Sequence, residues 1–433
     1  MKLPYAAVEF TTDGQPNPDQ VTAAVAAARS AQATDVLLIA HGWNNDIDGA
    51  TRMFERLTDN LADQLAAAPA GRRVAVTGVL WPSIRWADED EVAGGGASAG
   101  DAERRLHDNV DEAVEDPAVA SELHAAADRL AADPDDGRAA FLAALRRLLP
   151  DPDPSSEDPV PGPLADGDPD TVFAAAEEAL AGLEEDEEAV VGEPDEGPPG
   201  SFPDLLADDD VGGAGLLDII RNPVEVGRNL LNLTTYYTMK DRAGKVGSRG
   251  LTQLQARLRE GVPGVRLHLA GHSFGARVVS AAAAAAATPV HSVSLLQGAF
   301  SHFGFAHDYA RSGKDGLFRP AVTGQALVGP IIVTHTHKDS AVRTAYAIAS
   351  RLARQIGADL GGGPNDPYGG IGANGALQTD EADQGRLEAV GFGYQFRPRR
   401  IQNLLADQFV ANHSRVTGPE VAHALRSAMT TVP

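Results

Sequence analysis

Cysteine is absent from this 433-residue chain, so disulfides, thiolate metal sites and a cysteine nucleophile are all excluded. Long hydrophobic runs are missing as well. The most apolar run, residues 278–287, is short and mostly alanine, whereas a helix that crosses a bilayer needs about 20 apolar residues. The first five residues lead directly into polar sequence, without the apolar core of a signal peptide. We therefore expect a soluble, cytoplasmic protein with no stable insertion into a membrane.

Lysine is scarce, and basic residues do not offset the acidic ones. The chain has 36 Lys and Arg against 61 Asp and Glu, a net charge of −25. This imbalance is local: residues 88–217 hold 37 acidic and 6 basic side chains, whereas the remainder holds 24 acidic and 30 basic ones. No basic stripe accompanies the acidic block, so we do not expect nucleic acid as a partner. The pattern indicates an acidic insertion in an ordinary domain.

Outside the acidic segment, strand and helix patterns alternate along the chain. Short apolar runs, typical of strands buried on both faces, predict strands over residues 5–10, 36–40, 74–80, 265–270, 290–296 and 331–334. Helices are expected after the capping residues Asn17 and Asp46, and over residues 251–258, 277–287, 342–353 and 416–428. A glycine-rich loop is expected over residues 361–375. Such alternation predicts an α/β fold with a doubly wound, mostly parallel sheet.

The acidic segment divides the predicted domain in two. We expect a main domain formed by residues 1–87 and 216–433, interrupted by an acidic, partly helical insertion at residues 88–215. Its helices are expected near residues 101–131, 138–149 and 171–189. High charge predicts loose packing, as in a solubilising or partner-binding appendage. The apolar face around Phe141 and Leu145 instead favours a partial lid.

A nucleophile motif follows one of the predicted strands. Gly271-His272-Ser273-Phe274-Gly275 fits the pattern Gly-x-Ser-x-Gly, and it lies between an apolar strand and an apolar helix. In this strand–turn–helix context the serine takes a strained conformation, and the two glycines leave room for the turn. The motif therefore predicts Ser273 as a catalytic nucleophile.

A serine nucleophile requires a histidine base and a carboxylate that orients it, in the chain order Ser, Asp, His for this motif. Asp339 follows the strand predicted over residues 331–334, and His413 precedes the final helix. We therefore expect Asp339 and His413 to complete a triad. The other downstream carboxylates that could supply the acid are Asp366, Asp380 and Asp407.

The oxyanion of an acyl-transfer reaction needs two backbone N–H donors. One donor is expected from Phe274, the residue after the nucleophile. The second is expected from Trp43, with Gly42 as the alternative, because His41-Gly42-Trp43 follows a buried strand. In this arrangement we expect His41 to be a structural hydrogen-bonding residue.

Several segments resemble uncharacterised bacterial α/β-hydrolases that pair a His-Gly-aromatic loop with a Trp-Pro-Ser strand end. The matching segments are His41-Gly42-Trp43, Trp81-Pro82-Ser83, residues 271–275, residues 297–302, Asp339-Ser340-Ala341 and residues 413–420. The resemblance covers roughly residues 5–86 and 228–430. It implies Ser273, Asp339 and His413 as the triad and esterase-like acyl transfer, and it implies nothing about the insertion. We expect a serine hydrolase of a small-molecule carboxylic ester, with no cofactor and no metal.

Two alternatives remain open from the sequence. The segment His335-Thr336-His337-Lys338-Asp339 resembles the His-x-His-x-Asp-His motif of metallo-β-lactamase-like hydrolases, although Ser340 stands where the last histidine is expected. The second alternative is a non-catalytic scaffold whose acidic insertion binds a protein partner.

Overall fold

The structure is a computed structural model. It describes residues 1–43, 47–66, 71–83, 99–153, 156–157, 159–187, 222–339, 342 and 369–432. Several predictions lie outside these residues: the Asp46 cap, the helix over 342–353 apart from Val342, most of the glycine-rich loop, Asp366, and both expected boundaries of the insertion.

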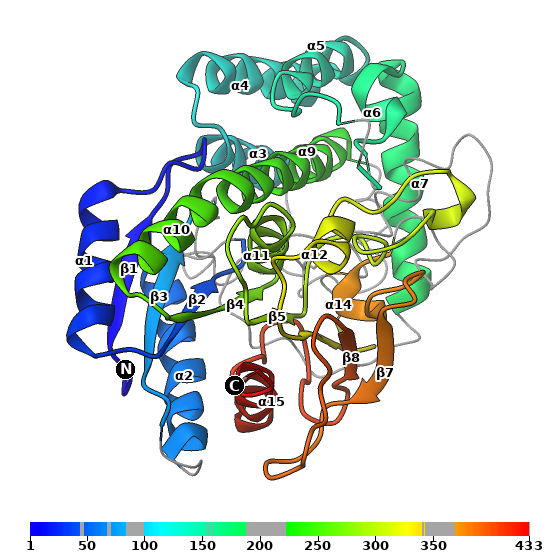
Figure 1. The fold of residues 1–433 in the computed structure, drawn as a ribbon. Helices are drawn as coiled ribbons and strands as arrows, with labels where there is room; N and C mark the ends of the chain where they lie inside the picture. Colours follow the sequence, from blue (N-terminus) through cyan, green and yellow to red (C-terminus); the bar gives the residue numbers. More distant parts are fainter. Residues whose placement is uncertain are drawn as a thin grey trace.

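The core of the molecule is a single sheet of eight parallel strands (Figure 1). Its spatial order is β1-β3-β2-β4-β5-β6-β8-β7. The strands are β1 (Tyr5–Glu9), β2 (Asp35–Ala40), β3 (Val74–Leu80), β4 (Arg266–His272), β5 (Ser292–Leu296), β6 (Ile331–His335), β7 (Ala382–Arg386) and β8 (Ile401–Leu405). Each parallel pair is joined through a crossover, as α/β folds require. The predicted α/β class is confirmed, with a sheet in which every described pairing is parallel.

Helices cover both faces of the sheet. One face carries α1 (Pro18–Ser30), α10 (Thr252–Gly261) and α11 (Phe274–Ala284), and the other carries α2 (Ile47–Ala66) and α15 (Pro419–Met429). Short elements complete this part: a π-helix over Val246–Leu251, a 3₁₀ turn over Tyr309–Arg311, α12 (Arg319–Thr323) and α14 (Ile371–Asn374). Asn17 caps α1 as predicted, because its Oδ1 accepts the N–H groups of Asp19 and Gln20 at 3.1 and 3.3 Å. Among the described helices, none combines the length and apolar character that crossing a bilayer demands.

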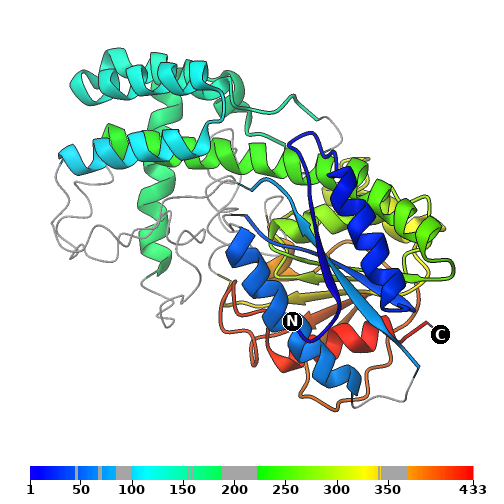
Figure 2. The same ribbon diagram turned by 90° about the vertical axis from the view of Figure 1, so that its left-hand side faces the viewer.

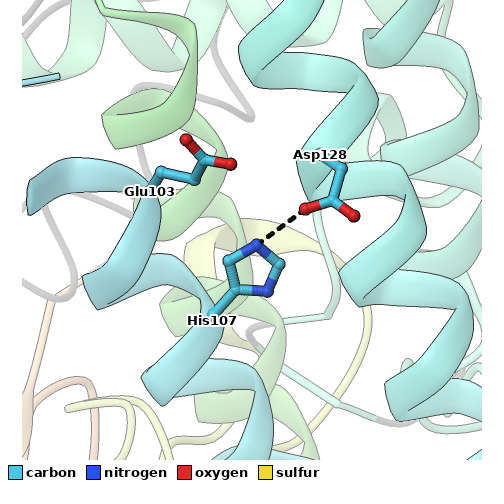
Figure 3. A group of neighbouring side chains, drawn as sticks. All are labelled: Glu103, His107 and Asp128. Atoms are coloured by element: carbon cyan, nitrogen blue, oxygen red, sulfur yellow. Dashed lines mark ion pairs between the residues drawn. The ribbon is translucent and has the colours of Figure 1, made fainter. Parts of the chain in front are cut away.

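The described part of the acidic segment is a packed helical layer. It contains α3 (Ala99–Ala113), α4 (Pro117–Ala132), α5 (Pro134–Arg146), α6 (Gly162–Asp166) and α7 (Pro169–Glu187). Helix α3 runs beside α4 (Figure 3), and Pro117 and Pro134 begin new helices. The single helix expected near residues 101–131 is therefore two helices. The expected loose packing is wrong for these residues, because their apolar side chains are buried in a shared core.

That core is closed by α9 (Pro223–Lys245), a helix that the sequence analysis did not predict. Asn222 caps it, with Pro223 at its first position. Helix α9 lies between the acidic segment and α11 (Figures 1 and 2). A Cβ added to Gly227 would lie 2.8 Å from Leu130 and 3.2 Å from Phe141, so the backbone of α9 approaches α4 and α5 closely. The apolar face around Phe141 thus packs on α9, and the structure provides no evidence that it forms a lid.

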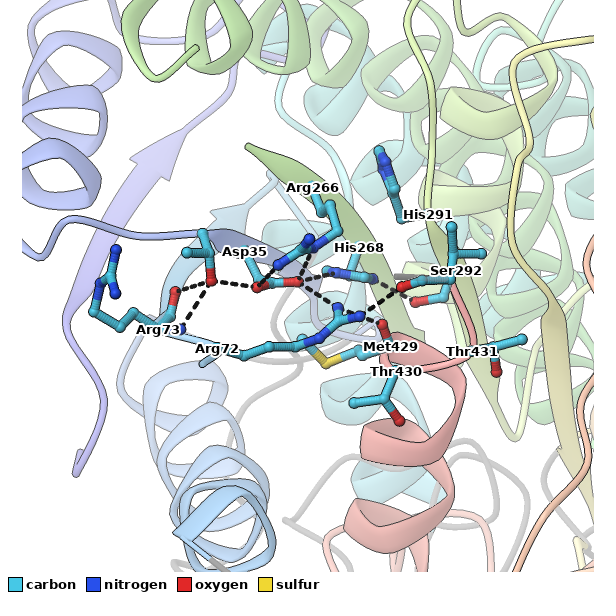
Figure 4. Close-up of polar contacts among 12 residues, drawn as sticks. Asp35, Arg72, Arg73, Arg266, His268, His291, Ser292, Met429, Thr430 and Thr431 are labelled. Atoms are coloured by element: carbon cyan, nitrogen blue, oxygen red, sulfur yellow. Dashed lines mark hydrogen bonds and ion pairs between the residues drawn. The ribbon is translucent and has the colours of Figure 1, made fainter. Parts of the chain in front are cut away.

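A polar network joins the amino ends of three central strands (Figure 4). Asp35 is fully buried at the start of β2, and its carboxylate accepts from Arg266 at 2.9 and 3.0 Å and from Arg72 at 2.8 Å. His268 lies between Asp35 and Ser292, at 3.0 and 2.8 Å. Burial opposes ionisation of Asp35, but the hydrogen bonds from His268 and Arg266 outweigh it and hold the pKa of Asp35 well below its usual range. This network stabilises the end of the sheet opposite to the predicted site.

Candidate active site

The order of the strands places a topological switch point between β2 and β4. From β2 the chain continues to β3 on one side, whereas β4 and β5 follow on the other side. Ligands in open α/β sheets bind outside the carboxyl ends of the strands at such a switch point. Both loops that leave these two strand ends carry predicted site residues. A Cβ added to Gly42 would lie 2.8 Å from Ser273 Cβ, so the two loops meet.

Ser273 lies on a sharp turn between β4 and α11. Its backbone has φ 55° and ψ −123°, a conformation that is costly for a residue with a side chain. Three backbone hydrogen bonds hold it: its N–H donates to Leu296 at 3.1 Å, and its carbonyl accepts from Ala276 at 3.0 Å and Ala299 at 3.1 Å. The surrounding structure therefore maintains the strain.

The two glycines of the motif are required by close backbone contacts. A Cβ on Gly271 would lie 2.1 Å from the carbonyl oxygen of Gly275. A Cβ on Gly275 would lie 2.3 Å from the carbonyl oxygen of Ala40 and 2.5 Å from that of His41. Backbone atoms cannot rotate away as a side chain can, so only glycine fits at either position. The second contact also brings the start of α11 against the end of β2.

Asp339 and His413 form a buried pair. Asp339 follows β6, and His413 lies between β8 and α15. The His413 Nδ1 atom is 3.0 Å from both carboxylate oxygens of Asp339. Oδ1 of Asp339 also accepts the N–H of Val342 at 3.0 Å. Of the other carboxylates considered, Asp380 is exposed and Asp407 is bound to Thr336 and His337.

His272 links this pair to the turn at Ser273. Its ring centroid is 4.9 Å from that of His413, and its Nε2 lies 2.9 Å from the His413 carbonyl oxygen. Because a carbonyl only accepts, His272 Nε2 carries the hydrogen and donates it. Burial lowers the pKa of His272 to about 3, so the ring is neutral at pH 7. The sequence analysis quoted His272 only as part of the motif, because nothing local indicates a contact with a residue 141 positions away.

His41 orients the peptide between Gly42 and Trp43. Its Nε2 accepts the Trp81 N–H at 3.3 Å, which places the ring hydrogen on Nδ1, 2.8 Å from the Gly42 carbonyl. Burial lowers the pKa of His41 to about 4 and keeps this neutral form at pH 7. In a trans peptide the Trp43 N–H points opposite to the Gly42 carbonyl, and therefore away from the His41 ring. His41 makes the structural hydrogen bonds expected of it.

Aromatic side chains surround the start of α11. The rings of Trp43 and Tyr236 lie 5.9 and 5.2 Å from that of Phe274. All three side chains are buried, and Tyr236 comes from α9. The first N–H groups of α11, including that of Phe274, have no partner within the helix. They belong to the positive end of its dipole, which favours a negative charge there.

Two residues of the alternative metal motif, His337 and Asp339, have partners elsewhere. His337 is largely exposed, and its Nδ1 lies 2.9 Å from Asp407 Oδ2. His335 is buried at the end of β6, and Asp339 faces His413. Among the described residues, these three do not form a ligand cluster. This geometry gives the metal alternative no support.

Comparisons with known proteins add no constraint to this site. No family model, no curated protein and no solved structure matches the chain.

Proposed function

We propose that this protein is a serine hydrolase that cleaves carboxylic esters, with Ser273 as nucleophile and Asp339 and His413 as its acid and base. The observations that carry the proposal are the buried contact of His413 with both Asp339 oxygens and the strained turn of Ser273, whose neighbour His272 contacts His413. A buried imidazole–carboxylate pair and a serine on a strained turn are the parts of the constellation that activates a serine hydroxyl.

The proposed reaction begins with proton transfer from Ser273 to His413. Asp339 holds Nδ1 of His413, so Nε2 is the ring nitrogen that accepts the hydroxyl proton. The Ser273 oxygen attacks the ester carbonyl and forms a tetrahedral oxyanion. Collapse of this intermediate breaks the carbon–oxygen bond, and His413 returns the proton to the leaving alcohol. Water then attacks the acyl-enzyme by the same route and restores the free serine.

The proposed oxyanion site combines two loops. Phe274 supplies the N–H at the start of α11, where the helix dipole favours negative charge. Trp43 supplies the second N–H, because the bond from His41 to Gly42 sets the orientation of their shared peptide. Gly42 remains the alternative second donor. Neither donor has to reorganise when the charge develops, which is the main source of stabilisation at such sites.

The finer features of the fold belong to the same proposal. A nucleophile after β4, an acid after β6 and a histidine after β8 lie at one edge of the sheet, as an α/β-hydrolase fold requires. The acidic helices would then be the insertion, and α9, which follows it in the chain, covers α11 and supplies Tyr236 to the surroundings of Phe274.

Hydrolysis of p-nitrophenyl esters of increasing acyl length tests the activity and reveals the preferred chain. Ser273→Ala should lower kcat/KM by about 10³-fold or more, because only binding and the oxyanion site remain. Ser427→Ala on α15 is the control and should retain full activity. Equal turnover by Ser273→Ala and the wild type would contradict the proposal, and a folded but wholly inactive wild type would favour the non-catalytic scaffold.

A further inference from the structure

A second cluster of chemically active side chains lies between helices α3 and α4. Its residues are far from Ser273 in the sequence. Glu103 and His107 are one helical turn apart on α3, and Asp128 faces them from α4 (Figure 3). One ligand atom from each of these residues lies within 4.8 Å of the others. The cluster combines an imidazole with two carboxylates, which distinguishes it from an ordinary acidic surface.

A chain of three polar contacts runs through this cluster. His107 Nε2 is 3.0 Å from Asp128 Oδ1, and His107 Nδ1 is 2.5 Å from His124 Nδ1. At the far end, His124 Nε2 is 2.7 Å from Asp111 Oδ1. The two rings are stacked, with centroids 4.8 Å apart. In each of these three polar contacts, both of the atoms are able to accept a hydrogen bond.

Two neutral imidazoles cannot satisfy these three contacts. Each neutral ring carries one N–H hydrogen, and ionised carboxylates carry none. If His124 donates from Nε2 to Asp111, and His107 donates from Nδ1 to His124, both hydrogens are used. With this placement the lone pair of His107 Nε2 faces the carboxylate of Asp128, and a proton or a metal ion between them would complete the third contact.

Glu103 lies at this same end of the chain of contacts, so a cation bound there would have three ligands. We propose that Glu103, His107 and Asp128 bind a divalent transition-metal ion of the zinc type. His124 and Asp111 position His107, because they fix its hydrogen on Nδ1 and direct the Nε2 lone pair at the metal. Such support of a metal-binding histidine by a second group is a general feature of metal sites.

The chemistry of the ligands favours zinc over magnesium or calcium. Imidazole suits zinc and related ions, whereas magnesium and calcium prefer oxygen ligands throughout. Zinc bonds of about 2.0–2.2 Å place neighbouring ligand atoms roughly 3.3 Å apart, close to the 3.0 Å contact of His107 with Asp128. Two carboxylates neutralise the ion, and water completes the coordination because Asp128 is 65% exposed. The ion would cross-link α3 to α4 within a segment of high negative charge.

The test uses the full-length, untagged protein after removal of metal with a chelator. Titration with Zn²⁺ should show one equivalent bound per chain and a raised Tm, and Co²⁺ should give the absorption bands of a protein-bound ion. His107→Ala should weaken zinc binding by about 100-fold or more, and His124→Phe by about 10- to 100-fold. Asp128→Asn removes one ligand at an exposed position and should also weaken binding. The control is His307→Ala, which removes an exposed His–Asp pair with a 2.7 Å contact elsewhere.

Either of two results would overturn the proposal. The first is zinc binding that is unchanged in both His107→Ala and Asp128→Asn, since the ion would then bind elsewhere. The second is a folded wild-type protein that binds no Zn²⁺ or Co²⁺ at 100-fold excess over the chain, since a proton would then satisfy the third contact. Neither readout depends on esterase activity, so the result is independent of the proposed function.

Discussion

Substitution of Gly42 by alanine tests whether its loop lies against Ser273, the proposed nucleophile. The added Cβ would lie 2.8 Å from Ser273 Cβ, 3.2 Å from His272 Nδ1 and 3.3 Å from Ser273 Oγ. Non-bonded carbon atoms prefer separations of about 3.5–4.0 Å, so one loop must move by about 1 Å. Ser273 cannot yield easily, because its backbone N–H and carbonyl are held by three hydrogen bonds.

A displacement of about 1 Å at a positioned reacting group costs on the order of 10²-fold in rate, and overpacking costs about 1–3 kcal/mol in stability. We therefore expect Gly42→Ala to remain folded, with a modestly lower Tm and a kcat/KM for p-nitrophenyl esters reduced about 100-fold. Gly393→Ala is the matched control, because a Cβ there meets no atom within 4 Å. A folded Gly42→Ala variant with the kcat/KM of the wild type would refute the reasoning.

Three further outcomes are expected. Asp339→Asn should lower kcat by about 10³- to 10⁴-fold. In the double variant it should add little to the effect of Ser273→Ala, because the residues of a triad act as a unit; additive losses of kcat would contradict the proposed triad. His272→Phe should lower kcat by about 2- to 10-fold, because the hydrogen bond to the His413 carbonyl is lost. His272→Gln should restore part of the lost kcat. Equal kcat values for the two variants would assign the His272 ring a packing role only. Asp35→Asn should lower the free energy of unfolding in urea by about 2 kcal/mol or more at pH 7. This deficit should shrink as pH falls below about 4, because a carboxylate with a lowered pKa contributes its full stability above its unfolded value and loses it progressively below that value; a deficit independent of pH would contradict the assignment.

The fold was predictable where burial imposes one pattern on every residue. The prediction for β3 is correct to the residue, because most residues of this strand, which is buried on both faces, are apolar. β7 was missed because it is a partly exposed edge strand with the polar sequence Ala-Asp-Gln-Gly-Arg. β8 was missed because Gln402 and Asn403 interrupt its apolar pattern. Asn403 is nevertheless buried, since it exchanges two hydrogen bonds with the backbone of Ala376 at 2.9 Å.

The acidic segment shows the limit of charge as a predictor. Its net charge predicts loose packing, but charged side chains occupy the solvent faces of its helices while their apolar faces share one core with α9. The start of helix α9 can be recognised at Asn222-Pro223, but its apolar residues lie on all sides of the helix instead of on one face. A helix buried between two layers loses the amphipathic pattern by which helices are recognised.

At the candidate site, the sequence alone identified the parts that depend on local geometry. The glycines around Ser273 are a local steric requirement, and they can be read from five residues. The partners of His413 depend on tertiary contacts: the chain order of a triad suggested Asp339, but nothing suggested that His272 binds the His413 carbonyl. Hydrogen bonds such as that of His41 with Gly42 likewise emerge only when the loops are in place.

The most direct test of the central claim is labelling by a fluorophosphonate, followed by mass spectrometry of the digested protein. Such probes react only with a serine whose hydroxyl is activated by a base. The account predicts a single adduct on the peptide that contains Ser273, its loss in Ser273→Ala, strongly slowed labelling in His413→Ala, and normal labelling in Gly393→Ala. A folded protein that acquires no adduct, or one that is labelled on a different serine, would contradict the assignment of Ser273 as an activated nucleophile.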